Sequence, residues 1–171
     1  MARSRIVCSL IGAALGLCSA AGSTGCALAG NPAEPGAVSG DPAALAAAAA
    51  VCVDQVNILR ATVGDPPLAH SSRIDAFSAE AARVDGEAHQ AHKYFLATNG
   101  GYGLALAENV IPWWRLADYG SVEKIVRKGV SQMWSEGAGG YHYANMRGRY
   151  TEMGCGIALI NGEVTVSQDF H

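Results

Sequence analysis

The residues best suited to chemistry lie in the second half of the chain, where two histidines and two glutamates occur: His92, Glu108, Glu136 and His142. Neutral imidazole nitrogens bind divalent cations, and carboxylates either bind the same ion or hold the imidazole ring in one tautomer. The chain has only five histidines. Brought together by the fold, these four side chains form a candidate site for a divalent cation, Zn²⁺ or Mg²⁺.

A helix expected to begin at Ser72 positions the first histidine. Ser72 is expected to cap this helix, with Asp75 near its positive end. At about 100° per residue, His92 returns to the direction of Ile74 if the helix runs that far, so we favour His92 over His89 as the inward histidine. The apolar residues of the helix recur at intervals of three and four and form one stripe: Ile74, Phe77, Ala81, Val84 and Ala88.

A later helix, expected from Ser121 to about Glu136, positions one of the glutamates. Glu136 falls about 40° from the edge of the apolar stripe of this helix. A half-buried carboxylate beside the negative end of a helix needs a compensating partner. The GAGG sequence that follows turns the chain back and brings His142 close.

The remaining sequence predicts helices in the first part of the chain and a β-hairpin at its C-terminal end. An Ala-rich run over 43–63 predicts a helix that Gly64 and the prolines after it end. Near the C-terminus, Asn161-Gly162 predicts a type I′ turn between two strands of alternating apolar residues. Helices on both sides of a sheet with one apolar face give an α+β fold, a three-layer α-β-α sandwich with a C-terminal β-hairpin.

Four motifs occur in order along the chain: AENV at 107–110, MWSE at 133–136, HYANM at 142–146 and YTEMGCGIAL at 150–159. From about Val51 to the C-terminus they resemble the CAP superfamily, the SCP domain shared by cysteine-rich secretory proteins, antigen 5 and pathogenesis-related 1. The resemblance implies the three-layer sandwich. It also matches Glu108 and His142 to the family's glutamate and second histidine, while the first histidine stays open between His92 and His89.

The sequence departs from the family pattern at several positions. Ala107 replaces the glycine of the G-E-N signature, and Glu136 follows Trp134 by two residues where many members have three. The stretch 144–146 differs from the threonine- and glutamine-containing sequence of the loop that is linked to sterol binding in eukaryotic relatives. This difference argues against sterol specificity. The cysteine-rich module of animal members is missing, as in a bacterial-type exported member, which weakens the transfer of their ion-channel and reproductive roles.

The N-terminal residues predict export. Two arginines precede an apolar segment that is too short to remain as a transmembrane helix, which is typical of a signal peptide over 1–29. The sequence allows two ways of processing the leader: cleavage after Ala27-Leu28-Ala29, or acylation of Cys26 in an imperfect lipobox. We therefore expect a secreted or extracellular protein, or a lipoprotein anchored through Cys26, and no stable transmembrane segment.

One folded domain with one disulfide is expected after the leader. Residues 30–42, rich in Gly, Pro and Ala, predict a flexible tether before a CAP-like domain over 43–171. The domain holds two cysteines, Cys52 and Cys155, both in apolar runs that face the core. An even pair in an oxidising compartment predicts a disulfide.

Charge narrows the classes of partner. Two of the 12 basic residues and none of the 15 acidic residues lie in the leader, so the remaining chain carries about −5. With no Lys/Arg stripe, this charge argues against binding to nucleic acid or to anionic lipid surfaces. A small apolar or lipid ligand, for which Trp113 and Trp114 form a candidate aromatic lip, or a protein partner remains.

Two functions fit these residues. The first is a non-catalytic secreted binding module whose His/Glu cleft takes a divalent cation and an apolar or peptidic ligand. The second is a metal-dependent, peptidase-like hydrolase in which one of the two glutamates activates a cation-bound water. The sequence contains neither G-x-S-x-G nor H-E-x-x-H, and Cys155 is expected to be bridged. We therefore favour the binding module.

Overall fold

The computed structural model describes residues 40–171, so the leader with Cys26 and the tether up to residue 39 lie outside the described residues. The elements follow in the order α1 (Pro42–Thr62), β1 (Ala69–His70), α2 (Ser72–Ala88), α3 (Lys93–Gly103), β2 (Ala107–Arg115), α4 (Leu116–Tyr119), α5 (Val122–Trp134), the 3₁₀ turn η1 (Gly137–Gly139), α6 (Tyr141–Met146), β3 (Glu152–Ile160) and β4 (Glu163–Phe170).

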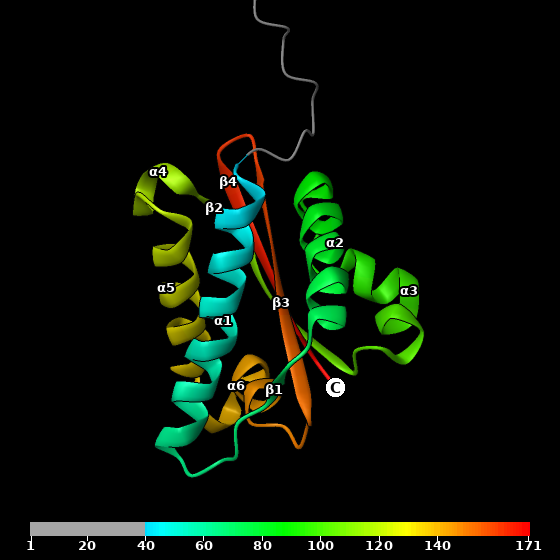
Figure 1. The fold of residues 1–171 in the computed structure, drawn as a ribbon, viewed down its shortest axis with the longest axis vertical. Helices are drawn as coiled ribbons and strands as arrows, with labels where there is room; N and C mark the ends of the chain where they lie inside the picture. The colour runs from blue at the N-terminus through cyan, green and yellow to red at the C-terminus, as the bar shows by residue number, and fades with distance from the viewer. Residues whose placement is uncertain (1–39) are drawn as a thin grey trace, which may run out of the picture. The chain divides into compact units, whose positions relative to one another are not determined.

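The strands form one mixed sheet between two helical layers. Their order is β1-β3-β4-β2, with β1 parallel to β3 and the other pairs antiparallel. Helices α1 and α5 cover one face, and α2 with α3 beside it covers the other (Figure 1). The predicted α-β-α sandwich and its C-terminal hairpin are confirmed. The sheet is larger than predicted, because β1 and β2 add an edge strand on each side of the hairpin.

Local signals explain the predicted elements. Pro42 occupies the first turn of α1, and the Asp41 side chain accepts a hydrogen bond of 3.0 Å from Ala43 N. In the β3–β4 turn, Asn161 and Gly162 have φ of 52° and 81°. Positive φ at both central residues is the signature of a type I′ turn.

Helix α1 is fixed to the sheet by the predicted disulfide. Cys52 is bonded to Cys155 on β3, 103 residues away in sequence. By length and composition, α1 is the one helix of the described part that could cross a membrane. Its bond to β3 and its buried residues, among them Val53 and Val56, show that it packs as a core helix.

The opposite face of β3 carries two glycines, Gly154 and Gly156. Side chains alternate between the two faces of a strand, so Gly154 and Gly156 face α2 while Cys155 faces α1. A Cβ on Gly156 would overlap the backbone of Ser78 and Ala79. These glycines allow α2 to pack directly against the sheet.

Two details of the predicted helices are wrong. Helix α2 begins at Ser72 as predicted, but its cap position is Ser71, whose side chain makes no capping bond. Asp75 instead binds two groups outside the helix, accepting from Cys155 N at 2.9 Å and pairing with His70 Nε2 at 2.7 Å. Helix α5 ends at Trp134, so Glu136 lies beyond the helix.

Candidate functional site: two histidine–glutamate pairs beside an edge strand

His92 reaches Glu108 from a turn and not from a helix. Helix α2 ends at Ala88, and His92 has a φ of 63° in the short connection to α3. Its Nδ1 lies 2.8 Å from Oε2 of Glu108, whose side chain on β2 is only 1% exposed. The helix-phase argument for His92 is therefore wrong, although His92 is the histidine beside Glu108. His89 contacts Glu163 instead.

A buried aspartate positions this turn. Asp85 Oδ1 accepts a hydrogen bond of 3.0 Å from Tyr94 N in the first turn of α3. Burial raises the pKa of Asp85, and the hydrogen bond to Glu108 raises the pKa of His92. The environment of Glu108 thus favours a protonated His92 more than water does.

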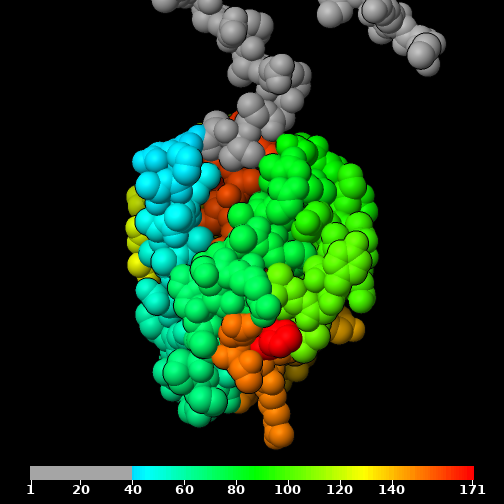
Figure 2. Space-filling view, turned by 45° about the vertical axis from the view of Figure 1, so that its right-hand side comes forward, coloured from blue at the N-terminus to red at the C-terminus, as the bar shows by residue number. Residues whose placement is uncertain are grey.

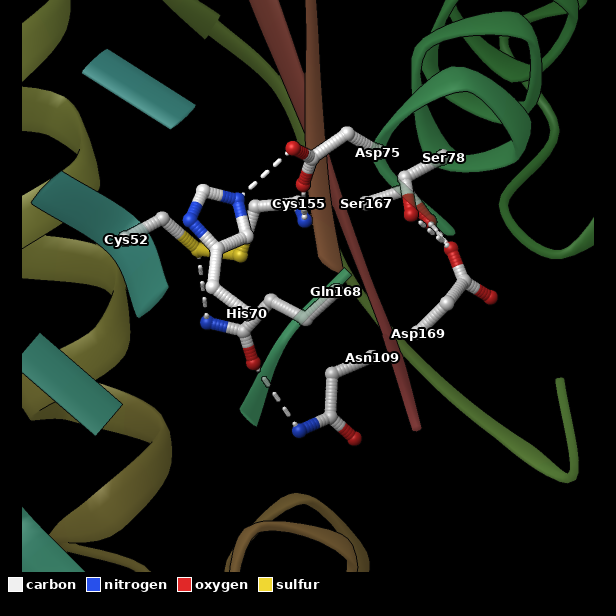
Figure 3. The surroundings of a disulfide bond; sticks show 9 residues. All are labelled: Cys52, His70, Asp75, Ser78, Asn109, Cys155, Ser167, Gln168 and Asp169. Carbon is white, nitrogen blue, oxygen red and sulfur yellow. Dashed lines mark hydrogen bonds and ion pairs between the residues drawn. A yellow bond between two sulfur atoms is a disulfide. The ribbon is translucent and has the colours of Figure 1, made fainter. Parts of the chain in front are cut away.

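Behind Glu108, hydrogen bonds continue into the interior. Ser167 Oγ lies 2.8 Å from Glu108 Oε1. Ser167 Oγ also lies 2.9 Å from Asp169 Oδ2, to which Ser78 Oγ donates at 2.6 Å (Figure 3). A serine hydroxyl carries one proton and cannot donate to both carboxylates. Burial and the nearby Glu108 raise the pKa of Asp169 to about 8. A protonated Asp169 that donates to Ser167 satisfies every one of these contacts.

The second pair is more exposed. His142 Nδ1 lies 2.6 Å from Glu136 Oε1, and both side chains are 35% exposed. Glu136 precedes η1, and His142 lies in the first turn of α6. The glycine-rich turn thus brings His142 to Glu136, as the sequence predicts.

Two asparagines join the pairs across β2. Asn109 Nδ2 donates to the carbonyl of His142 at 3.2 Å, and Asn145 Nδ2 donates to Asn109 Oδ1 at 2.9 Å and to the Glu108 carbonyl at 3.2 Å. Glu108 and Asn109 are consecutive on a strand, so their side chains lie on opposite faces. The two pairs are therefore linked through these asparagines at β2, an edge strand of the sheet.

A buried arginine holds the helix that carries His142. Arg60 on α1 is 2% exposed and donates to the carbonyls of Pro66, Met146 and Gly148 at 2.9, 2.6 and 3.2 Å. Met146 is the last residue of α6. The guanidinium satisfies carbonyls that the end of this short helix leaves unpaired.

The chemistry of the four residues is that of two separate pairs. In each pair Nδ1 contacts a carboxylate, and within residues 40–171 neither Nε2 atom has a hydrogen-bond partner. Among these same residues, no three His, Cys, Asp or Glu side chains form a group that could hold a metal ion. The structure brings the four predicted residues together as two pairs, each histidine beside one glutamate.

The model of the cysteine-rich secretory protein (CAP) family matches residues 53–170. The chain belongs to this family. No curated protein gives a significant match. Membership confirms the resemblance seen in the ordered motifs, and the disulfide of this CAP domain is typical of proteins outside the reducing cytosol, in agreement with the predicted export.

Two grooves of the CAP domain are candidate ligand sites. One, of about 260 Å³, borders the second pair, and its walls include Val110, Ile111, Trp114, Met133, Glu136 and His142. The other, of about 340 Å³, lies between α1 and α2, where β3 is visible in Figure 2. Of the predicted aromatic lip, Trp114 borders the first groove and stacks on Tyr119, whereas Trp113 contacts His89.

Several residues of this site escaped the sequence analysis. The sequence pattern gives Ser167 and Asp169 no role beyond a strand, and Asn109 and Asn145 no role beyond the motifs that contain them. The polar run Ser167-Gln168-Asp169 in a strand expected to be buried is the available signal. Buried polar side chains need partners, so such a run indicates a hydrogen-bonded cluster.

Proposed function

We propose that this CAP-domain protein is an exported, non-catalytic binding module that takes a divalent cation at His92 and His142 and a small apolar or lipid ligand in the groove beside His142. One observation carries the proposal: each imidazole uses Nδ1 to contact a glutamate, which leaves Nε2 for an ion. A carboxylate on the far nitrogen fixes the tautomer and makes the ring a better ligand.

The donor atoms favour zinc over magnesium. Imidazole nitrogen suits Zn²⁺, whereas Mg²⁺ prefers oxygen ligands in an octahedral arrangement. With two protein nitrogens, water molecules would complete the coordination, so the affinity should be modest. A bound zinc ion would supply open coordination positions for the polar end of a ligand.

The groove supplies the apolar part of the proposed ligand site. Val110, Ile111 and Met133 give it apolar walls, and His142 with Glu136 adds polar groups at the same groove. Small-molecule sites commonly combine mostly apolar walls with a few polar groups that orient the ligand. This combination supports a ligand with an apolar body and a polar end.

Zinc titration by calorimetry tests the cation site. The wild type is expected to bind one zinc ion at neutral pH, and His142→Ala to bind it at least about tenfold more weakly. His70→Ala is the matched control, because His70 also contacts a carboxylate, Asp75, at 2.7 Å but lies outside the site. Equal binding in His142→Ala and the wild type, or no binding in the wild type, would overturn the proposal.

A peptidase screen with and without zinc tests the non-catalytic part. We expect no cleavage in either condition. Zinc-dependent cleavage that Glu136→Gln or Glu108→Gln abolishes would favour the hydrolase, with a glutamate as the base that activates a zinc-bound water.

A further inference from the structure

A separate cavity of about 390 Å³ lies beside the β3–β4 turn, and it shares no lining residue with the groove beside His142. Its walls include Glu87, His89, Trp113, Ile160, Glu163 and Thr165. They come from the end of α2, from β2 and from the hairpin. None of these residues takes part in the proposed cation site.

An irregularity in β2 places Trp113 in this cavity. The pairing of β2 with β4 shifts register between Ile111 and Trp114, and Trp113 has a φ of 35°. A bulge of this kind redirects a side chain, and positive φ is a genuine outlier for a bulky residue. Trp113 N donates to Thr165 Oγ1 at 3.4 Å, which holds the bulge in place.

A second residue with left-handed backbone faces the same cavity. His89 has a φ of 47°, and its ring meets the Trp113 ring edge-on, with centroids 5.3 Å apart and planes at 83°. Its Nε2 lies 2.7 Å from Glu163 Oε2. Strained backbone concentrates at ligand sites, and here two such residues form one wall.

The charges of the cavity select among ligand classes. Two carboxylates, Glu87 and Glu163, line it, and no described Lys or Arg does. Arg83 binds Glu87 at 2.8 Å, and Glu163 contacts His89 at 2.7 Å. Arg115 is the cross-strand partner of Glu163 in the β2–β4 pairing but does not line the cavity. An anion would therefore be repelled. A wholly apolar ligand would remove water from Glu163 and Thr165 without replacing its hydrogen bonds.

We propose that this cavity binds a small organic ammonium ion, with the cation between the Trp113 ring and the Glu163 carboxylate. The indole face attracts cations more strongly than other aromatic side chains, and desolvation strengthens the attraction. Ile160 offers contact for the carbon substituents of the ammonium group. The proposal does not depend on the function proposed for the histidine–glutamate pairs.

Calorimetric titration of the purified protein with choline tests the proposal. Choline should bind with one site and millimolar affinity. Its neutral analogue 3,3-dimethyl-1-butanol, which has a carbon in place of the nitrogen, should bind at least about fivefold more weakly. Equal affinities for the two compounds, or no binding of choline, would overturn the proposal.

Two variants locate the site. Glu163→Gln should weaken choline binding about fivefold, whereas Glu152→Gln, which removes the same charge at the other end of the hairpin, should leave it unchanged. Trp113→Asn should abolish binding without lowering the unfolding temperature, because asparagine tolerates a left-handed backbone. Wild-type affinity in Glu163→Gln would contradict the assignment, even where Trp113→Asn proves unstable.

Discussion

Two neighbouring rows of residues run across the sheet and carry different chemistry. The carboxylate row faces α2 and contains Gly154, Asp169 and Glu108, whereas the disulfide row faces α1 and contains Cys155, Gln168 and Asn109. Figure 3 shows the disulfide, Gln168 and Asn109 on one side and Asp169 with its serines on the other. Adjacent residues on each strand thus face opposite sides of the sheet, one lined by ionisable side chains and the other by neutral ones.

The neutral row has no group that titrates near neutral pH. Gln168 Nε2 donates to Cys52 Sγ at 3.6 Å, and Gln168 Oε1 accepts from Asn109 Nδ2 at 3.1 Å. Asn109 also holds the backbone of His142. This side of the site is therefore fixed by bonds that should be insensitive to pH.

The carboxylates between the sheet and α2 are less completely satisfied. Asp85 Oδ2 and Asp169 Oδ1 are buried and have no hydrogen-bond partner among the described residues. Each unpaired buried oxygen costs free energy, and ionisation raises that cost. The comparison indicates that pH acts on the His92 side of the site through Glu108 and its neighbours, while the His142 side keeps its backbone position.

Removal of the disulfide should have the largest effect on stability. The bond closes a loop of 103 residues, and the chain-entropy model gives about 4–5 kcal/mol for a loop of that length. We expect Cys52→Ala/Cys155→Ala to lower the free energy of unfolding by about this amount in urea. The wild type under reducing conditions is the control and should lose a similar amount. A loss below about 1 kcal/mol would show that packing alone holds α1 on the sheet.

Asp169→Asn should change how stability depends on pH. The pKa of Asp169 is near 4 in an unfolded chain and about 8 in the folded one. Between these values the folded state binds a proton that the unfolded state lacks, so stability falls as pH rises, by up to about 1.4 kcal/mol per pH unit. The variant lacks this term, so its stability relative to the wild type should rise by at least about 1 kcal/mol from pH 5 to pH 8.

Urea unfolding at several pH values measures this difference. Glu123→Gln is the control, because Glu123 is exposed and bonded to Arg127 on the surface of α5. Parallel pH profiles for wild type and Asp169→Asn would mean that Asp169 is ionised in the folded protein. In that case Ser167 would have to donate to Asp169 and leave Glu108 without its hydrogen bond.

Local signals predicted one row better than the other. Within the disulfide row, Cys155 alternates with the apolar residues Met153 and Ile157 on β3, and such a pattern depends only on neighbouring residues. The carboxylate row joins α2, β2 and β4, and its contacts connect residues up to 91 positions apart, as between Ser78 and Asp169. No periodicity within one element reveals such contacts.

The same reasoning explains the elements that were missed. Pro112 and the two tryptophans after it interrupt alternation in β2, and the glycines near the end of α3 give no helical pattern. The prediction of His92 assumes a helix that continues to residue 92, whereas α2 ends at Ala88. His92 still lies beside Glu108, because the turn after α2 directs its ring inward.

Glu136→Ala should have the smallest effect on stability, and it tests the comparison between the two pairs most directly. Its partner His142 and the carboxylate itself are each 35% exposed, so the pair should contribute less than about 0.5 kcal/mol. Glu108→Ala, in contrast, leaves His92 and the buried Ser167 without an acceptor and should cost about 2 kcal/mol. Urea unfolding of the two variants at pH 7 measures both values. If Glu136→Ala proves as costly as Glu108→Ala, the second pair supports the fold as the first does, and the idea that His142 keeps its position without its carboxylate is wrong.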